Sequence, residues 1–356
     1  MSDDLKERVD NALDEFVGNA TSGLRDLGDE LSPVADAASE FVLDAGKRLR
    51  PAFCYWGALY AGAPDSDALV RAAASLELLQ ACALVHDDVI DHSDTRRGRP
   101  AVHRRFASLH DTAGWAGDAD DFGAAAAILL GDVLLAWSEE MFATSGLHDE
   151  ALRRAQPVSA KMRTEVMAGQ YLDIVEQARG ATTVERALRV ARLKSAKYTV
   201  ERPLHLGAAI AGADPAYAET FTRFGIPVGE AFQLNDDMLG VFGDPTVTGK
   251  PAGDDLREGK QTVLTALALE RASDQEAELL RASLGRPDLG EEAIDHLRRI
   301  IRDSGAADEV MTMITARLSD AHDALNDAPV ASTETQRAGR SRLIGLASAA
   351  AGFGKR

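Results

Sequence analysis

The chain has 356 residues, of which 45% are hydrophobic, a composition typical of a globular protein with a large buried core. The formal net charge is −18, so most of the surface repels a polyanion, and a broad nucleic-acid interface is excluded. The start, MSDDLKER, lacks a basic segment followed by an apolar core, and no secretory signal is expected.

Two further observations concern membranes and compartment. The most apolar run, residues 124–130, is far shorter than a membrane span, so no transmembrane segment is expected. Cys54 and Cys82 show no metal-ligand or disulfide spacing. They predict packed thiols in a reducing compartment, which indicates the cytoplasm.

Residues 1–30 are polar and acidic, and they predict a peripheral amphipathic helix that packs loosely or against a partner. From residue 46 onward, long segments with apolar residues at helical spacing alternate with short polar breaks rich in glycine and proline. No break resembles a flexible linker between domains. The residues therefore predict an all-α protein, with a single domain over residues 1–356. The tail from residue 274 has helical periodicity without a chemical signature and is expected to serve packing.

The first acidic cluster follows an apolar helical segment and reads His86-Asp87-Asp88-Val89-Ile90-Asp91-His92-Ser93-Asp94. Helical geometry places Asp87 and Asp91 one turn apart on one face, with Asp94 a further turn along, so the carboxylates can converge on one cation. Oxygen ligands of this kind suit Mg²⁺, which shares its coordination shell with substrate phosphates. A solvated acidic face is the alternative, but the basic run 96–99 directly after the cluster favours a site.

The second acidic cluster, Phe232-Gln233-Leu234-Asn235-Asp236-Asp237, repeats the arrangement at the end of another largely apolar stretch. A loop with the sequence GKPAGDDLREGK follows at residues 249–260. Two acidic helix ends, each followed by basic residues, are what a diphosphate held between metal ions requires.

With these clusters the sequence resembles the trans-isoprenyl diphosphate synthases, closest in character to bacterial geranylgeranyl diphosphate synthases. Five motifs carry the resemblance in order: GKRLRP at 46–51, DDVID with RRGRP at 87–100, GQYLD at 169–173, KSA at 194–196, and FQLNDD with GKPAGDDLREGK. The resemblance implies a bundle of long helices around a central active-site cavity, and a homodimer.

The resemblance also implies roles for individual residues. Asp87, Asp91 and Asp236 would bind Mg²⁺, with three ions expected when substrate is bound, while Asp88 and Asp237 would orient waters or basic side chains. The residues expected to bind the diphosphate of isopentenyl diphosphate are Lys47, Arg50 and Arg97. Those expected around the allylic diphosphate are Arg96, Lys194, Lys250 and Lys260, with Ser195, Gln233, Gln170, Asp173 and Gln80 as polar neighbours.

The implied reaction is a prenyl transfer. An allylic diphosphate (dimethylallyl, geranyl or farnesyl) ionises while magnesium and cationic side chains neutralise the departing diphosphate, and isopentenyl diphosphate attacks the cation. The product is a linear (E)-prenyl diphosphate. The family points to the released diphosphate as proton acceptor, so no role in catalysis is expected for His86 or His92. Gly240 departs from the family pattern, which usually has a third Asp there, and predicts a looser water shell around the third magnesium.

Product length is expected from the helix before Asp87. Cys82 and Ala83 are small, where short-chain members often carry aromatic rings that block the cavity, so geranylgeranyl diphosphate is favoured over farnesyl or longer polyprenyl products. Two other readings stay open. A class I terpene cyclase would share the first cluster but needs no second diphosphate site, and a non-catalytic subunit of a heteromeric synthase would lack one of the clusters.

Overall fold

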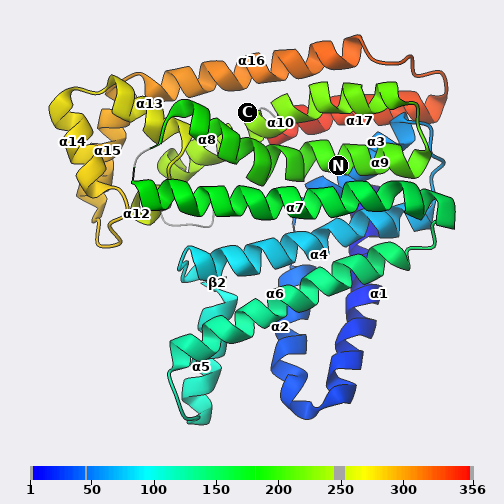
Figure 1. The fold of residues 1–356 in the computed structure, drawn as a ribbon, viewed down its shortest axis with the longest axis horizontal. Coiled ribbons are helices and arrows are strands. Elements are labelled where there is room, and N and C mark those ends of the chain that lie inside the picture. The colour runs from blue at the N-terminus through cyan, green and yellow to red at the C-terminus, as the bar shows by residue number, and fades with distance from the viewer. Residues whose placement is uncertain (1–2, 45, 181, 244–252, 353–356) are drawn as a thin grey trace. The chain divides into compact units, whose positions relative to one another are not determined.

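A computed structural model describes residues 3–44, 46–180, 182–243 and 253–352 of the chain. Figure 1 shows that helices make up nearly all of the ordered structure, and the all-α class expected from the sequence is confirmed. Contacts divide the chain into two compact units, Met1–Tyr55 with Pro64–Leu152, and Trp56–Ala63 with Arg153–Arg356. The single domain over residues 1–356 stays a prediction.

The first unit carries the first aspartate cluster. Its elements are α1 (Asp3–Leu27), the 3₁₀ helix η1 (Asp29–Leu31), α2 (Ser32–Leu43), α4 (Asp67–Ile90), β1 (Thr95–Arg96), β2 (Arg99–Pro100), α5 (Val102–Ala113) and α6 (Ala119–Ala143). Helices α3 (Leu49–Tyr60) and α7 (Asp149–Arg179) begin in this unit and continue into the second. Strands β1 and β2 pair antiparallel, with Thr95 opposite Pro100, and form a short hairpin after α4.

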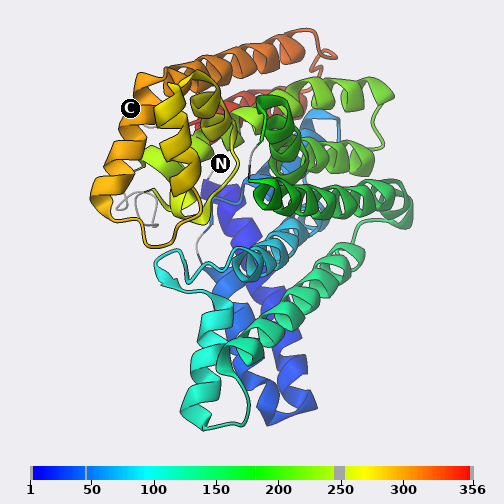
Figure 2. The same ribbon diagram turned by 60° about the vertical axis from the view of Figure 1, so that its left-hand side comes forward.

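Helix α4 is the apolar centre of the first unit. Ser66 caps its first turn, because the serine Oγ accepts a hydrogen bond from the Leu69 amide at 3.2 Å. Helices α1, α2, α5 and α6 all contact it, and Figure 2 shows α5 beside α6. By length and composition α4 could cross a membrane, but 72% of its apolar window is buried within the protein, as in a core helix.

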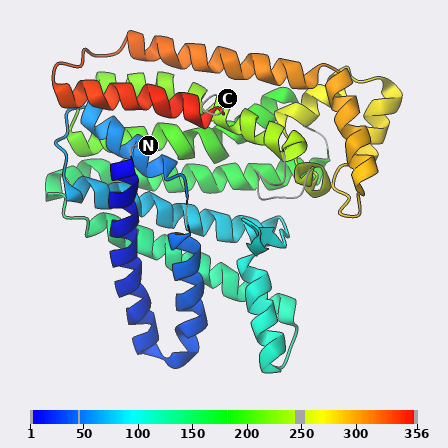
Figure 3. The ribbon, with the colours of Figure 1, turned by 180° about the vertical axis from the view of Figure 1, so that it is seen from behind.

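Helix α1 packs its apolar face inside the same unit, against α2 and α4, and Figure 3 shows it running beside α2. The apolar residues of α1 that are at most 1% exposed are Leu5, Val9, Leu13 and Val17. On another face of α1, the Asp10 carboxylate accepts a hydrogen bond from Arg48 Nε at 2.8 Å. Helix α1 therefore holds the segment 46–51, which contains one of the basic motifs.

The second unit carries the second cluster. Its elements are α8 (Val184–Ala191), the π-helix η2 (Arg192–Glu201), α9 (Arg202–Ala211), α10 (Pro215–Phe242), α12 (Asp254–Glu258), α13 (Val263–Arg271), α14 (Asp274–Ser283), α15 (Glu291–Asp303), α16 (Ala306–Asn326) and α17 (Glu334–Ala350). Helix α16 runs along α10, and Arg317 on α16 pairs with the buried Glu230 on α10 at 2.6 Å. The tail therefore packs on the helix that ends in the second cluster.

The π-helix η2 lies against two helices through glycines. A Cβ added at Gly169 of α7 would lie 2.5 Å from the Lys194 nitrogen, and one added at Gly229 of α10 would lie 2.3 Å from the Ala196 Cα. Both distances are shorter than a real Cβ contact allows. The wide turns of a π-helix therefore fit here only because these neighbours lack side chains.

Replacing Gly229 by Ala tests this packing. The added methyl group meets backbone rather than a movable side chain, so we expect the free energy of unfolding to fall by about 1–3 kcal/mol in urea titrations followed by circular dichroism. Gly345→Ala on α17 is the control, because nothing lies within 4 Å of the added atom. The control should raise stability by roughly 0.5–1 kcal/mol, and equal effects of the two changes would contradict the packing argument.

Candidate active site

The first cluster splits its adjacent aspartates between two environments. Successive helical residues point about 100° apart, so Asp87 is partly exposed whereas Asp88 is fully buried. Arg96, on the hairpin strand β1, donates from Nε to Asp88 Oδ1 at 2.9 Å, and its Nη2 contacts the same oxygen. Arg96 Nη2 also lies 3.6 Å from Asp87 Oδ2. The buried carboxylate thus holds an arginine beside the accessible one.

The acidic run leaves the helix earlier than the sequence predicted. Helix α4 ends at Ile90, Asp91 is its C-cap, and His92 has a positive φ of 54°. Asp94 therefore does not continue the helical face of Asp87 and Asp91. Its carboxylate instead accepts a hydrogen bond from Arg104 of α5 at 2.6 Å. The placement of Asp94 on that face is wrong, and Asp94 belongs to the hairpin.

The basic residues of the first unit come from two segments that meet. Lys47 is exposed and Arg50 is half-buried, on the segment before and at the start of α3. Arg97 of the hairpin lies 3.6 Å from Asp44, and its guanidinium stands over the Phe41 ring at 6.0 Å. These contacts with the end of α2 bring Arg97 to the chain that leads into Lys47.

Arg48 differs from its basic neighbours. It is 4% exposed, with Nη1 donating to Glu77 of α4 at 3.0 Å and Nε donating to Asp10 of α1. A buried arginine bound by two carboxylates from different helices fixes backbone position rather than binding a ligand. Arg48 therefore anchors the segment that presents Lys47 and Arg50.

The two small residues before Asp87 on α4, Cys82 and Ala83, lie in different environments. Gln80, Ala83 and Asp87 are all partly exposed, at the i, i+3, i+7 spacing of one helical face. Cys82 is 3% exposed, and its Sγ lies 3.8 Å from His86 Nδ1. Burial raises the pKa of the Cys82 thiol to about 12. Cys82 therefore packs inside the unit, and its expected influence on product length stays a prediction.

The second cluster repeats the division seen in the first. Asp236 is exposed and the adjacent Asp237 is 5% exposed. Gln233, one turn earlier on α10, donates from Nε2 to Asp237 Oδ1 at 2.7 Å, and Ser195 of η2 donates to Gln233 Oε1. Burial raises the pKa of Asp237 well above its usual range, and the hydrogen bond from Gln233 opposes this rise. The charges of Asp255 and Asp236 raise the pKa further, and Lys260 lowers it.

Lys194 and its neighbours form a polar group around η2 and α7. Lys194 Nζ lies 2.7 Å from Asp173 Oδ2. Gln170 lies one turn before Asp173 on α7, and its Nε2 is buried with no hydrogen-bond partner in the described part of the chain. An amide donor of this kind is costly unless a ligand or water completes it. This group therefore offers one cation and one amide donor in the second unit.

Lys260 stands just after the short helix α12. Its Nζ lies 2.8 Å from Glu258 Oε2 and 3.4 Å from Asp255 Oδ1. Lys250, also predicted for the allylic diphosphate, lies outside the described residues.

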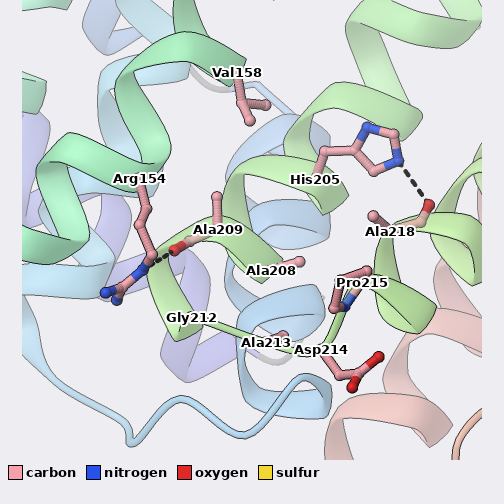
Figure 4. A pocket seen from close by; sticks show the side chains of 10 residues that line it. All are labelled: Arg154, Val158, His205, Ala208, Ala209, Gly212, Ala213, Asp214, Pro215 and Ala218. Atoms are coloured by element: carbon pink, nitrogen blue, oxygen red, sulfur yellow. Dashed lines mark hydrogen bonds between the residues drawn. The ribbon is translucent and has the colours of Figure 1, made fainter.

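A hollow of about 320 Å³ also lies in the second unit, among α7, α9 and α10 (Figure 4). Arg154 Nε donates to the Ala209 carbonyl at 3.0 Å, and a hydrogen bond of 3.0 Å joins His205 Nε2 to the Ala218 carbonyl. None of the predicted site residues lines this hollow. Its polar side chains, Arg154, His205 and Asp214, already bind backbone groups, so we assign it no part in the reaction.

Comparisons with known proteins decide the family. A sequence model of the family described as polyprenyl synthetase matches residues 32–301. The chain belongs to the polyprenyl synthetase family. The geranylfarnesyl diphosphate synthase of Aeropyrum pernix is 32% identical over 307 residues, which cover 85% of this chain and 90% of that protein. The geranylgeranyl diphosphate synthase of Mycobacterium tuberculosis is 33% identical, covering 80% of this chain and 76% of that protein.

Solved structures give the same result for this polyprenyl synthetase. A geranylgeranyl pyrophosphate synthase from Corynebacterium glutamicum, complexed with isoprenyl diphosphate and magnesium, has a TM-score of 0.94 and 42% identity. The match covers 99% of both chains. The resemblance to geranylgeranyl diphosphate synthases is confirmed, and the chain is a prenyltransferase that makes prenyl diphosphates.

The donor set fits magnesium. Asp87, Asp91 and Asp236 offer carboxylate oxygens that are at least partly accessible, and hard oxygen donors are what Mg²⁺ prefers. Among the described residues, no group of three His, Cys, Asp or Glu side chains already forms a coordination cage. Magnesium needs no such cage, because it keeps several waters and binds through one or two carboxylates plus substrate phosphates.

Sequence reasoning missed two supporting groups. Arg202 of α9 is buried and forms hydrogen bonds through Nε and Nη2 with both oxygens of Glu165 on α7, at 2.5 and 2.8 Å, beside the end of η2. Their distance in sequence gave no signal for this pair. Asp255 lies in a recognised motif but received no role. Its carboxylate lies beside Gly240, where an added Cβ would be 1.9 Å from Asp255 Oδ2.

Proposed function

We propose that this polyprenyl synthetase condenses isopentenyl diphosphate with an allylic diphosphate in a magnesium-dependent reaction. The observation that carries the proposal is the division of both aspartate clusters into one accessible and one buried carboxylate. Accessible Asp87, Asp91 and Asp236 bind the magnesium ions, three with substrate bound. Buried Asp88 and Asp237 orient the donors beside them.

The basic residues divide between two diphosphates. Lys47, Arg50 and Arg97 bind isopentenyl diphosphate, a role supported by the contact that brings Arg97 to the segment of Lys47. The residues that serve the allylic diphosphate are Arg96, Lys194, Lys250 and Lys260, with Gln80, Gln170, Asp173, Ser195 and Gln233 as polar neighbours. The complex of the Corynebacterium glutamicum enzyme with isoprenyl diphosphate and magnesium supports a diphosphate site in this fold.

The chain's own residues position the reactants and neutralise charge on the departing diphosphate. Bound magnesium neutralises charge on the departing diphosphate, which lets the allylic carbon ionise. Arg96 and Lys194 are held by Asp88 and Asp173 before any substrate arrives, so little reorganisation is needed at the transition state. The partly exposed face of α4 before Asp87 would form the wall along which the product grows. The released diphosphate accepts the proton.

The product is proposed to be geranylgeranyl diphosphate. Ala83 is small and partly exposed one turn before Asp87, which leaves room for a tail longer than fifteen carbons. Farnesyl and longer polyprenyl products are the alternatives. Curated relatives that make geranylgeranyl or geranylfarnesyl diphosphate support the longer range.

A class I terpene cyclase and a non-catalytic subunit are disfavoured. The separate basic group Lys47, Arg50 and Arg97 has no purpose in a cyclase, and both aspartate clusters are present, which a non-catalytic subunit would not need. Turnover that requires isopentenyl diphosphate, from this chain alone, discriminates among the three.

The enzyme is proposed to act as a cytoplasmic homodimer. Ile128 and Leu129 of α6 are 47% and 65% exposed, and an apolar helix face of this kind favours burial against a second copy. Both cysteines are free and buried, which suits a reducing compartment.

The first test is metal dependence. Chelation should abolish turnover, and Asp87→Ala or Asp236→Ala should lower kcat/KM by about a hundredfold or more, because charge stabilisation specific to the transition state is lost. Asp94→Ala is the matched control, since Asp94 pairs with Arg104 away from that helix face. Activity of Asp87→Ala equal to that of the control would contradict the metal assignment.

A second test separates the two diphosphate sites by steady-state kinetics with each substrate varied in turn. Arg50→Ala should raise KM mainly for isopentenyl diphosphate and Lys194→Ala mainly for the allylic partner, each by roughly tenfold to a hundredfold, the worth of a hydrogen bond to a charged group. Exposed Arg99 provides the control as Arg99→Ala, with both constants unchanged. A reversed pattern would show that the sites are exchanged.

A third test concerns chain length, measured by mass spectrometry of the products. Ala83→Phe places an aromatic ring on the face that leads to Asp87, and overpacking of about 1–3 kcal/mol shifts product ratios tenfold or more toward farnesyl diphosphate. Ala83→Ser is the volume control and should keep the wild-type products. An unchanged profile in a folded Ala83→Phe variant would place the wall of the cavity elsewhere.

A further inference from the structure

The side chain of His86, which the proposed reaction does not use, joins the last turn of α4 to α6. Its Nε2 lies 3.0 Å from the Ile128 carbonyl oxygen on α6. Its ring lies against Gly131, where an added Cβ would be 2.0 Å from Nε2 and 2.3 Å from Cδ2. Both distances are shorter than a real Cβ contact allows. The ring therefore fits against α6 only because residue 131 has no side chain.

The partners of the two ring nitrogens determine where the ring carries its hydrogen. A carbonyl oxygen only accepts, so Nε2 must carry a hydrogen to bond with Ile128. Nδ1 lies 3.8 Å from the Sγ of Cys82, one turn earlier on α4. Burial raises the pKa of the Cys82 thiol to about 12, so the sulfur keeps its hydrogen and can donate it to Nδ1. A ring with hydrogen on Nε2 alone satisfies both contacts.

His86 and Asp88 anchor the turn that carries Asp87 from two directions. Successive side chains leave a helix about 100° apart, so the neighbours of Asp87 reach different elements. His86 bonds to α6, whereas Asp88 binds Arg96 of the hairpin. The backbone of Asp87 is therefore held by the residues on both sides of it.

A small rotation of this turn would move its carboxylates by a distance that matters to a metal ion. Side chains end roughly 5–6 Å from the helix axis, so a rotation of about 20° displaces a carboxylate by about 2 Å. Magnesium requires near-ideal octahedral geometry, with each oxygen at about 2.0–2.1 Å. We propose that His86 is a positioning residue, which fixes the last turn of α4 on α6 so that Asp87 and Asp91 bind magnesium. The inference rests on the proposed magnesium-dependent function.

An ion pair is the alternative role for His86. Asp132 Oδ1 lies 3.8 Å from His86 Nε2, and the Asp132 side chain is 63% exposed. A protonated ring would attract Asp132 but could not accept a hydrogen from Cys82. The two roles respond differently to substitution. An uncharged side chain with a donor in the place of Nε2 preserves the positioning contact and abolishes the ion pair.

The test is isothermal titration calorimetry of the full chain with Mg²⁺ at saturating inorganic pyrophosphate, which needs no turnover. His86→Asn, whose short amide reaches only the place of Nδ1, should lower the Mg²⁺ affinity by about tenfold or more. His86→Gln, whose longer amide can donate to Ile128 in the place of Nε2, should stay within about threefold of wild type. Asp132→Asn removes the alternative partner's charge and should also bind like wild type.

Gly131→Ala tests the same contact without changing His86. The added methyl group overlaps the ring and expels it, so the Mg²⁺ affinity should fall as in His86→Asn. Alanine also favours a helix over glycine, so the melting temperature should be kept or raised. Combined with His86→Asn, this change should add no further loss, because both remove one contact. Gly18→Ala on α1, with nothing within 4 Å of the added atom, is the matched control.

Nitrogen-15 NMR of the metal-free chain above neutral pH provides a readout that does not depend on magnesium. The ring signals of His86, assigned by their loss in His86→Gln, should show hydrogen on Nε2 and none on Nδ1. Hydrogen on Nδ1 would contradict the bond to Ile128 and overturn the inference.

The binding outcomes separate this inference from the proposed function. Wild-type Mg²⁺ affinity in His86→Asn or in Gly131→Ala overturns the inference alone, even where the melting temperature falls, because the contact is then structural only. A loss in His86→Gln as large as that in His86→Asn, shared by Asp132→Asn, assigns His86 to the ion pair and also overturns it. A wild-type chain that binds no Mg²⁺ with pyrophosphate overturns the proposed function itself.

Discussion

The need to hold like charges together is the constraint on which the rest of the structure depends. Two carboxylates at about 4 Å near a protein surface repel by roughly 4 kcal/mol, and the chain already has a net charge of −18. Helical geometry relieves part of this repulsion by sending adjacent aspartates to different environments. The buried aspartates of the two clusters have different partners, since Asp88 binds a guanidinium whereas Asp237 binds an amide. Burial raises the pKa of Asp237, and the hydrogen bond from the uncharged Gln233 amide only partly offsets that rise.

The cations of the site are subject to the same constraint. Lys194 and Lys260 both rest against carboxylates of their own unit. Ion pairs that keep some contact with water are worth at most about 1 kcal/mol, so a diphosphate with several charges can compete for these groups. These ion pairs therefore hold the cations in place but leave them able to bind a diphosphate. Pairs with a buried carboxylate differ: Asp88 is fully buried and holds Arg96 in place, and the buried pair of Arg48 with Glu77 fixes the backbone.

The sequence allowed prediction of the helices, the family and the accessible aspartates, because each depends on local spacing. It could not show which side of α4 is covered, since that helix is apolar nearly all round and burial follows from its neighbours. Cys82 and Ala83 are adjacent, yet only Cys82 is fully buried against its surroundings. The π-helix η2 was equally hidden, because its width depends on the contacts of Gly169 and Gly229 with a segment far away in sequence.

The relation between Gly240 and Asp255 shows why a motif read along the chain can mislead. Spacing suggested that the second cluster had lost a carboxylate, whereas the structure places one in the same volume from another helix. Asp255 and Lys260 belong to one short segment between Gly253 and the start of α13, and the Asp255 carbonyl is bonded to the Lys260 amide. The Asp255 carboxylate beside Gly240 and Lys260, which we propose binds the allylic diphosphate, must therefore move together when α12 is displaced.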